Sequence, residues 1–169
     1  MNFEDFIIAP RNFKTEKWQI GSKITKNIKE DSIVLLFVSD YRGIIDHAEV
    51  QDFTAIRKEF YKLSNLDFEI PIVDLGDLVS GKTIQDTHYI LQEVLSVCHH
   101  NKALPIIVGG SNDFAFSLFS ALNFQHKDIN YTQVNNVVSL AQGDEINERN
   151  FLSKIFATKN FSIKNYHHL

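Results

Sequence analysis

The chain has 169 residues, of which 44% are hydrophobic and 22% are charged, and its formal net charge is -4. This length supports one domain with a full core, and the composition is typical of globular proteins, which excludes disordered and fibrous classes. The negative charge and the scattered lysines exclude the basic field that nucleic-acid-binding proteins present. We therefore expect residues 1–169 to form a single domain with no nucleic-acid partner.

The cysteine content and the amino terminus bear on localisation. The single cysteine, Cys98, excludes an internal disulfide and a multi-cysteine metal site. The chain starts Met-Asn-Phe-Glu-Asp-Phe, with acidic groups where a signal peptide has a basic region. No apolar run approaches the roughly 20 residues that span a membrane. We expect a cytoplasmic protein that has no membrane partner.

The amino-terminal part of the chain predicts two short elements. Residues 1–13 alternate weakly between apolar and polar groups and are broken by Pro10, which indicates an edge strand or an ordered arm. Residues 15–28 place their large apolar side chains on roughly one face, and this spacing predicts a short helix.

Four apolar runs predict the strands of a sheet. Residues 32–38 form a continuous run, which is typical of a central parallel strand that is buried on both faces. Residues 68–75 give a second strand, and Pro71 within it indicates an edge or a local irregularity. Residues 104–108 give a third strand, expected in the centre of the sheet, and residues 133–141 give a fourth.

Helical spacing of apolar residues recurs between these strands. Residues 49–63 predict a surface helix, and residues 83–101 give the strongest helical pattern in the chain, with Thr83 as its cap. Residues 112–122 and 147–157 predict two further helices. Strands and helices alternate without a hairpin, and right-handed crossovers then produce a three-layer α/β/α fold with a mainly parallel sheet.

The turn after the third predicted strand is the place where we expect the functional site. Gly109 and Gly110 end the strand, and Ser111, Asn112 and Asp113 follow before the next helix. Because the carboxyl ends of parallel strands line a shared crevice, these three side chains would point into the site. Asn112 or Asp113 could instead cap the following helix by accepting from its free amides, and the two roles are compatible.

Other polar residues have simpler interpretations. Three of them lie at predicted strand ends and would reach the same edge of the sheet: Asp40, Arg42 and Asp144. His99 and His100 end the long helix, where an imidazole interacts favourably with the exposed carbonyl groups. His88 is expected to face solvent.

The segment from Gly76 to Thr83, Gly-Asp-Leu-Val-Ser-Gly-Lys-Thr, satisfies the phosphate-loop pattern and lies between a predicted strand and a predicted helix. In such a loop, backbone amides hold phosphates, Lys82 reaches the terminal phosphates and Thr83 binds magnesium. Asp77 would place a carboxylate among the backbone amides that would bind the phosphates. This favours an ordinary loop followed by a capped helix start. A nucleotide-binding module at this segment stays open as an alternative.

Two strand-end motifs resemble those of a known enzyme family. Val73-Asp-Leu-Gly-Asp-Leu78 and Pro105-Ile-Ile-Val-Gly-Gly110, followed by a strand near residues 137–144, resemble the amino-terminal half of the ureohydrolases, which include arginase, agmatinase and formimidoylglutamase. The resemblance implies an arginase-like three-layer fold with two manganese ions at the strand ends. It also implies that a metal-bound hydroxide attacks a guanidinium or formimino carbon. The chain would then be the amino-terminal part of a longer protein.

The family's metal ligands are largely absent from the matching positions. Where the family has Gly-Gly-Asp-His, this sequence has Gly109-Gly110-Ser111-Asn112. Where the family has Asp-Ala-His-x-Asp, this sequence has Leu140-Ala141-Gln142-Gly143-Asp144 and keeps only the last carboxylate. The family's third motif would lie beyond residue 169. Manganese prefers anionic oxygen and imidazole ligands, so one carboxylate should not hold a metal pair.

These departures predict a ureohydrolase-like domain with a degenerate dimanganese site and a non-catalytic binding or regulatory role. The site-lining candidates are Ser111, Asn112, Asp113, Gln142 and Asp144, and we expect no bound cofactor. The alternative is an active hydrolase of a guanidino or formimino C–N bond, with manganese as the cofactor if the full chain is active. A small guanidino or formimino compound and a second copy of the chain stay open as partners.

Overall fold

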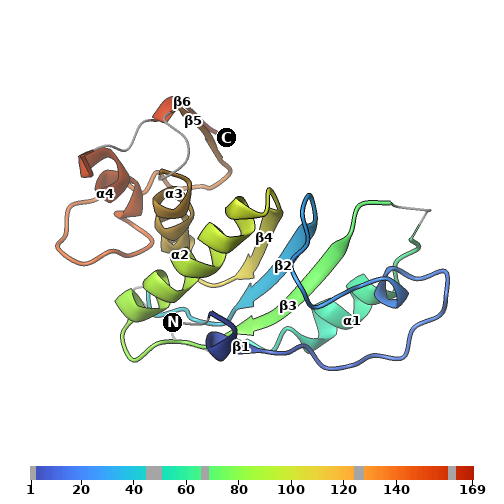
Figure 1. The fold of residues 1–169 in the computed structure, drawn as a ribbon. Helices are drawn as coiled ribbons and strands as arrows, with labels where there is room; N and C mark the ends of the chain where they lie inside the picture. Colours follow the sequence, from blue (N-terminus) through green and yellow to red (C-terminus); the bar gives the residue numbers. More distant parts are fainter. Residues whose placement is uncertain (1–2, 45–50, 66–68, 124–127, 160–162) are drawn as a thin grey trace.

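The computed structural model describes residues 3–44, 51–65, 69–123, 128–159 and 163–169. Its main sheet contains the strands β1 (Ile7–Ile8), β2 (Ile33–Val38), β3 (Ile72–Leu78) and β4 (Leu104–Gly109). Their order across the sheet is β1-β3-β2-β4 (Figure 1). β1 runs antiparallel to β3, whereas β3, β2 and β4 are parallel to one another.

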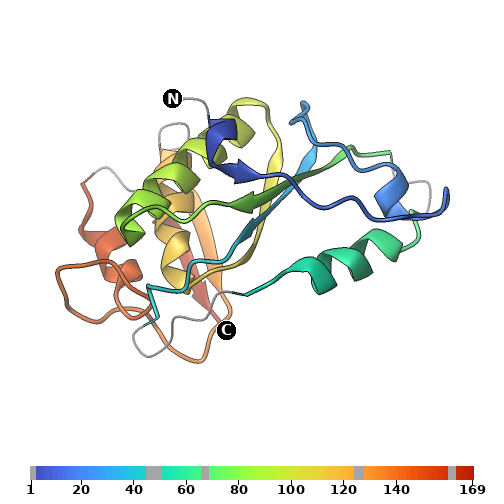
Figure 2. The same ribbon diagram turned by 90° about the horizontal axis from the view of Figure 1, so that it is seen from below.

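Helices cover both faces of this sheet (Figure 2). α1 (Thr54–Lys62) lies on one face, α2 (Ile84–His100) packs on the other, and α3 (Ala115–Asn123) packs against α2. Three short 3-10 turns complete this part: η1 (Phe3–Phe6), η2 (Ile20–Ser22) and η3 (Asn112–Phe114). The predicted three-layer α/β/α class with a mainly parallel sheet is confirmed.

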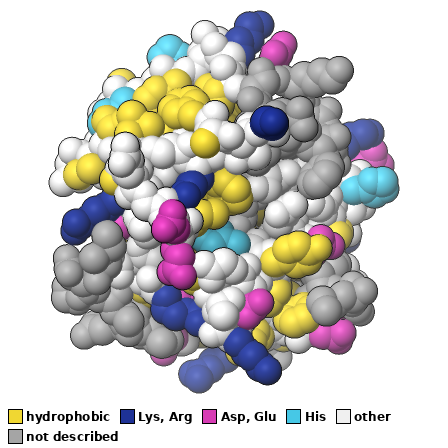
Figure 3. All heavy atoms as spheres, turned by 90° about the vertical axis from the view of Figure 1, so that its left-hand side faces the viewer, with side chains coloured by type: hydrophobic (Ala, Val, Ile, Leu, Met, Phe, Trp, Pro, Cys, Tyr) yellow, Lys and Arg dark blue, Asp and Glu magenta, His cyan; other side chains and the backbone are white. Residues whose placement is uncertain are grey.

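A smaller unit follows α3 in the chain. β5 (Ile129–Gln133) and β6 (Ile163–His168) form a two-stranded parallel sheet, and α4 (Phe151–Ala157) packs with this sheet and with α3 around a shared hydrophobic cluster. Hydrophobic side chains gather in the upper part of the face shown in Figure 3, which is the side of the molecule where α4 lies. Among the described helices, none combines the length and the apolar character needed to cross a bilayer.

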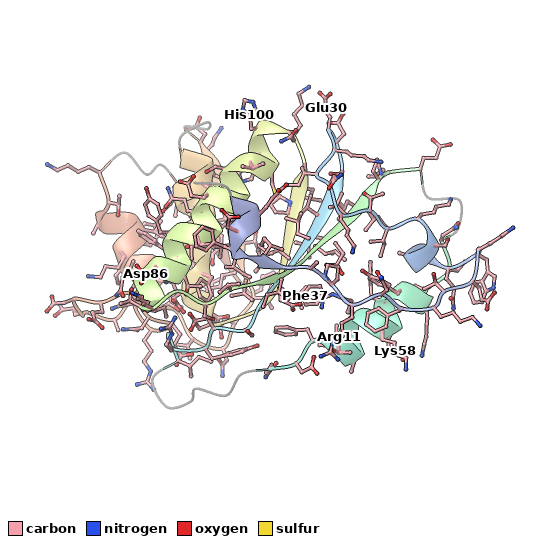
Figure 4. The ribbon with its side chains drawn as sticks, turned by 60° about the horizontal axis from the view of Figure 1, so that its bottom comes forward. Arg11, Glu30, Phe37, Lys58, Asp86 and His100 are labelled. Atoms are coloured by element: carbon pink, nitrogen blue, oxygen red, sulfur yellow. The ribbon has the colours of Figure 1, made fainter. Side chains whose placement is uncertain are left out.

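β2 is an inner strand whose alternate side chains serve two cores. Val34 and Leu36 face α2 and belong to the same buried cluster as Leu91. Leu35 and Phe37 face the opposite side, where Phe37 points toward α1 (Figure 4). Full burial of such a side chain contributes about 1.5–3 kcal/mol, so both faces of β2 stabilise the fold. The predicted strand buried on both faces is confirmed.

α2 begins at the cap that the sequence predicts. Thr83 Oγ1 accepts a hydrogen bond from the Asp86 backbone N–H at 3.1 Å, and Asp86 Oδ2 accepts one from the Thr83 N–H at 2.8 Å. This reciprocal capping box satisfies two amides that would otherwise lack a partner, and it contributes about 1 kcal/mol. The helix predicted over residues 112–122 is also confirmed, as η3 followed by α3.

Residues 15–28 do not form the predicted helix, because η2 is the only helical turn among them. The segment is instead mostly irregular, and Thr25 forms an isolated bridge with Val73 of β3. Thr25 N–H donates to Ile72 O at 3.0 Å, and Asp74 N–H donates to Thr25 O at 3.0 Å. Trp18 is 59% exposed, so the apolar spacing does not mark a buried helical face. Pairing with β3 outweighs the weak local preference for a helix.

The strand predicted over residues 133–141 is also wrong. β5 ends at Gln133, and residues 134–141 have no regular secondary structure. Val134 is 79% exposed, and Val137 and Val138 are exposed as well. β-branched residues favour a strand where a neighbouring strand pairs with them, and no described strand forms a ladder with this segment. The periodicity of the sequence does not indicate β6 at all.

The starts of three elements and the position of β4 in the sheet also differ from the predictions made from the sequence. α1 and α4 begin later than expected, at Thr54 and Phe151. Residues 49 and 50 of the helix predicted over residues 49–63, and residue 68 of the strand predicted over residues 68–75, lie outside the described residues. β3 begins directly after Pro71 and is an inner strand, so the proline marks its start. β4, expected in the centre, is the outer strand of the described sheet, and Leu104 on it is 61% exposed.

Candidate functional site

The predicted site turn lies at the carboxyl end of β4. Gly109 and Gly110 have φ values of +86° and +75°, which residues with a Cβ rarely adopt. A Cβ built at Gly109 would also lie 2.2 Å from Phe53 Cζ. The two glycines therefore let the chain turn sharply from β4 into η3, and Ser111 follows at the strand end as the sequence predicts.

Ser111 and Asp113 point into the protein, whereas Asn112 between them is exposed. Asp113 Oδ2 lies 2.8 Å from Nε2 of His88 in α2, and His88 Nδ1 lies 2.8 Å from Ser117 Oγ in α3. We refer to His88, Asp113 and Ser117 as the His88 network. It joins the turn after β4 to two helices that pack against each other.

The hydrogen bonds of the His88 network restrict where its protons lie. Ser117 Oγ approaches the His88 carbonyl oxygen at 3.1 Å, and its single proton satisfies either that oxygen or His88 Nδ1. In the first case the ring carries a proton on Nδ1, which donates to Ser117 Oγ. In the second case Nδ1 accepts from the hydroxyl, and the ring carries its proton on Nε2, which donates to the Asp113 carboxylate.

The same residue types form hydrolytic triads, but in this protein they are enclosed. Ser117 is 1% exposed and His88 is 7% exposed, so no substrate can contact the hydroxyl that a nucleophilic mechanism would use. The network is therefore a buried connection between helices. The expectation that His88 faces solvent is wrong. Its spacing from Ile84 and Leu91 places it on the apolar stripe of α2, and that spacing is the signal that identifies it.

Gly43, in the loop after β2, packs against the turn that follows β4. A Cβ built at Gly43 would lie 2.1 Å from Asp113 Oδ1 and 2.5 Å from Ser111 Oγ. Both oxygens are buried and have no hydrogen-bond partner among the described residues. The Gly43 backbone thus lies directly against them, and the sequence pattern gives no signal for this close approach.

Asp40 and Arg42 form a second polar cluster beside the turn. Arg42 donates to Asp40 from Nε at 3.0 Å and from Nη2 at 2.6 Å, and Thr87 Oγ1 donates to Asp40 Oδ2 at 2.7 Å. Burial alone would raise the pKa of Asp40, but the hydrogen bonds from Arg42 and Thr87 outweigh it and hold the pKa below its usual range. The Ser111 N–H donates to the Asp40 carbonyl oxygen at 3.3 Å, so the cluster adjoins the turn.

Arg42 also explains the segment that satisfies the phosphate-loop pattern. The first three residues of that pattern belong to β3, and only residues 79–83 form a loop. Arg42 donates to the carbonyl oxygens of Gly81, Lys82 and Thr83 at 2.9, 2.8 and 3.2 Å. The loop thus turns carbonyls toward a cation, whereas a phosphate loop turns amides toward an anion. The geometry favours the ordinary loop and capped helix start.

The two aspartates of the motif within β3 pair with Arg57 of α1. Arg57 Nε lies 2.8 Å from Asp74 Oδ2, and Arg57 Nη1 lies 3.1 Å from Asp77 Oδ2. Tyr61 donates its hydroxyl proton to Asp74 Oδ2 at 2.8 Å. Burial, together with the charge of Asp74, raises the pKa of Tyr61. The motif therefore anchors α1 to β3.

Gln142 and Asp144 lie in the exposed segment between β5 and α4. The backbone holds this segment in place, because the Ala141 N–H donates to the Arg149 carbonyl oxygen at 2.9 Å. Within the described part of the chain, no hydrogen bond or ion pair joins Gln142 or Asp144 to the turn after β4. The structure therefore brings Ser111 and Asp113 together and leaves the other candidates in solvent.

The donor set at these positions does not fit a manganese pair. Asn112 and Gln142 are neutral, Leu140 has no ligand atom, and Asp113 is directed at His88. Manganese prefers anionic oxygen and imidazole ligands, which this combination does not supply. In the described ranges, no three His, Cys, Asp or Glu side chains gather into a group that could hold a metal ion.

Comparisons with known proteins identify the fold. No family model and no curated protein sequence matches the chain. The structure is similar to formimidoylglutamase from Bacillus subtilis, with a TM-score of 0.73, 17% identity, and coverage of 95% of this chain and 55% of that chain. Formiminoglutamase from Trypanosoma cruzi with Mn²⁺ gives a TM-score of 0.75 at 18% identity, covering 89% of this chain and 56% of that chain.

Proclavaminate amidino hydrolase from Streptomyces clavuligerus is similar too, with a TM-score of 0.65, 15% identity, and coverage of 90% of this chain and 57% of that chain. The T. cruzi protein was also solved with Mn²⁺ as a variant in which histidine replaces an asparagine. The chain spans a little over half the length of each of these proteins. The likeness shows the shared fold, so the arginase-like fold that the motifs imply is confirmed.

Proposed function

We propose that this chain is a ureohydrolase-like domain with a degenerate dimanganese site, which acts by binding or regulation rather than by catalysis. The observation that carries the proposal is that the carboxylates in and after the parallel strands of the main sheet are paired with other side chains of the domain. Asp40 pairs with Arg42, Asp113 pairs with His88, and the two aspartates of the β3 motif pair with Arg57. The domain itself thus occupies the carboxylates that could otherwise serve as metal ligands.

Moving one of these carboxylates to a metal would break a buried contact. Asp74 is 0% exposed and forms a buried ion pair with Arg57, and leaving the partner of such a pair alone costs about 3–5 kcal/mol. A dimanganese site needs several carboxylates, because a metal-bound hydroxide forms only where the ligands hold both ions. The resident pairs therefore compete with metal binding.

The T. cruzi formiminoglutamase bears on the role of Asn112. That protein was solved with Mn²⁺ in its own form and with histidine in place of an asparagine. An asparagine in such a protein is compatible with bound manganese, so the neutral side chain of Asn112 does not carry the proposal. The proposal rests instead on Leu140 and Gln142, which supply no anionic ligand, and on the paired carboxylates.

A small guanidino or formimino compound is the ligand class that we propose for the binding role. The fold neighbours are formimidoylglutamases and an amidino hydrolase, and this is the support for that class. Asp144 is the candidate carboxylate that remains exposed, so it can pair with a guanidinium or amidinium group. Hydrolysis of such a compound is the alternative function, and it would require further anionic metal ligands.

The proposal is tested by a hydrolysis assay on the purified protein with added manganese. Arginine and formiminoglutamate serve as substrates, and the release of urea and of formamide is measured. We expect rates equal to those of a heat-denatured control. Turnover above that control, lost with a chelator and restored by manganese, would overturn the proposal. Calorimetric titration with the same compounds measures binding, and Asp144→Asn should weaken it.

A further inference from the structure

β4 is the least buried of the three parallel strands of the main sheet. Within the described part of the chain, β2 is the only strand that pairs with β4 (Figure 1). Five of the six residues of β2 are buried, whereas none of the six residues of β4 is buried. Parallel strands are normally covered on both faces, so its exposure sets β4 apart from the rest of the sheet.

The exposed side of β4 is apolar. Leu104 is 61% exposed and Ile106 is 41% exposed, and the alternation of side chains along a strand places both on the same face as Val108. Val108 packs against the cluster that contains Leu35, on the α1 side of the sheet. Ile106 lines a mainly apolar cavity of about 290 Å³ together with Leu35 and with Phe60 of α1. The exposed strand therefore continues an apolar surface that reaches α1.

The two edges of the main sheet differ in their protection against pairing with another chain. Natural edge strands avoid such pairing through short length, charged side chains or proline. β1, at one edge of the described sheet, has only two residues. β4, at the other edge, has six residues and no charged side chain, and Pro105 is its single protective residue. β4 is therefore the open edge of the described sheet.

The backbone of β4 directs its residues alternately toward β2 and away from it. The Leu104 N–H donates to the Ser32 carbonyl oxygen at 2.8 Å, on the β2 side. Because successive residues of a strand direct their polar groups to opposite sides, Pro105, Ile107 and Gly109 face outward. Proline has no N–H. The outward edge thus offers the N–H groups of Ile107 and Gly109 and the carbonyl oxygens of Pro105 and Ile107.

We propose that two copies of this chain associate through β4, with the two β4 strands antiparallel and centred on Ile107. In this register Ile107 of each copy donates its N–H to the carbonyl oxygen of Ile107 in the other copy. The Gly109 N–H of each copy donates to the Pro105 carbonyl oxygen of the other, so these bonds do not require an N–H at Pro105. Donors and acceptors match by symmetry, as a two-fold dimer requires.

The same register pairs the exposed apolar side chains. Ile106 of each copy lies opposite Val108 of the other, at a position without backbone hydrogen bonds, where side chains approach most closely. Both side chains would then be removed from water. Because this chain covers 55% and 56% of two of its fold neighbours, a further stretch of polypeptide is the competing occupant. The symmetry of donors and acceptors about Ile107 favours a second copy. This proposal does not depend on the proposed function.

Sedimentation equilibrium of the full chain over a series of concentrations tests the proposal. We expect a reversible equilibrium between the monomer and a species of twice its mass. Ile106→Lys should weaken this association at least about tenfold, because the ammonium would lie against Val108 of the other copy. Ile8→Lys is the matched control, since Ile8 is 60% exposed on β1 at the opposite edge of the same sheet. This control should leave the association unchanged.

Disulfide formation between two single-cysteine variants tests the register. Ile106→Cys and Val108→Cys proteins are mixed and oxidised, and covalent dimers are counted by non-reducing electrophoresis. Opposed residues of this kind have Cα atoms about 4.5 Å apart, which permits a disulfide. Diagonal neighbours are about 7–8 Å apart, so neither variant should crosslink alone. The native Cys98 is buried and does not contribute.

Three outcomes would overturn the proposal, provided that circular dichroism shows each variant to be folded. A monomer at every concentration up to about 1 mM would leave the edge to a further stretch of polypeptide. Equal weakening by Ile106→Lys and Ile8→Lys would place the contact elsewhere. Crosslinking of each cysteine variant alone as readily as in the mixture would contradict the antiparallel register about Ile107.

Discussion

The turn after β4 and the segment from Leu140 to Asp144 are the two stretches whose sequences resemble ureohydrolase metal motifs, yet they have opposite environments. In the turn, Ser111 and Asp113 are buried, and Asp113 pairs with His88. In the later segment, Gln142 and Asp144 are exposed and no strand precedes them directly. The turn after β4 is part of the core, and the later segment is a surface loop.

The difference shows two ways in which a fold can accommodate polar residues. A buried carboxylate requires a partner, and Asp113 has one in His88 across the interface of α2 and α3. An exposed carboxylate is solvated and requires none. Substitutions in the turn should therefore affect the stability of the fold, whereas substitutions in the later segment should affect only the binding of ligands.

The largest effect is expected from Asp113→Ala. This change leaves His88 Nε2 buried without an acceptor and should lower the free energy of unfolding by about 3 kcal/mol. Urea denaturation measures the loss. Asp144→Ala is the matched control and should remain within about 0.5 kcal/mol of the unchanged protein. Equal losses of unfolding free energy in the two variants would contradict the difference between the turn after β4 and the later segment.

Gly43→Ala tests the packing over the same turn. The added Cβ would lie 2.1 Å from Asp113 Oδ1, so the loop after β2 must move away. We expect a loss of about 2 kcal/mol, as for other overpacked positions. Thermal unfolding of this variant beside Ala141→Gly, which changes the exposed segment, measures the difference. A Gly43→Ala protein with unchanged stability would show that the loop does not press on the turn.

Arg42→Ala should have a smaller effect that depends on pH. Asp40 has a folded-state pKa below its ordinary value, so its contribution to stability is present above about pH 4 and is lost as the pH falls through the folded-state pKa. Because Arg42 is partly exposed, solvent screening limits the effect of its removal to about 1 kcal/mol at neutral pH.

Urea midpoints at pH 6 and at pH 3 measure the effect of Arg42→Ala. The difference between the unchanged protein and the variant should shrink at the lower pH. Lys62→Ala breaks the exposed ion pair with Glu59 and serves as the control. A difference that stays constant with pH would show that the pair of Asp40 and Arg42 does not stabilise the fold.

The sequence predicts the parts of the fold that rest on local signals. The apolar run of β2, the Thr83 cap of α2 and the two glycines after β4 each specify their own conformation. The valines after Gln133 favour a strand by propensity. A strand also needs a neighbouring strand to pair with, and the sequence alone does not reveal that no described strand pairs with this segment. The bridge between Thr25 and Val73 of β3, which residues 15–28 make in place of a helix, depends in the same way on a distant segment.

The candidate site was predictable in position but not in its contacts. The turn with Ser111 and Asp113 follows from the strand and helix pattern. The partner of Asp113 lies 25 residues earlier in the chain, and only the stripe of α2 indicates that His88 faces inward. The approach of Gly43 leaves no pattern in the sequence, because it arises from the packing of the loop after β2.

We propose that the carboxylates in and after the parallel strands stabilise the fold and do not bind a metal pair, and the manganese content of the protein tests this proposal most directly. The purified chain and its Asn112→His variant are incubated with manganese, dialysed, and analysed by mass spectrometry for metal per chain. We predict well below one manganese per chain for both proteins, because one imidazole does not replace the missing carboxylates. Retention of about two manganese ions per chain by the unchanged protein would contradict it.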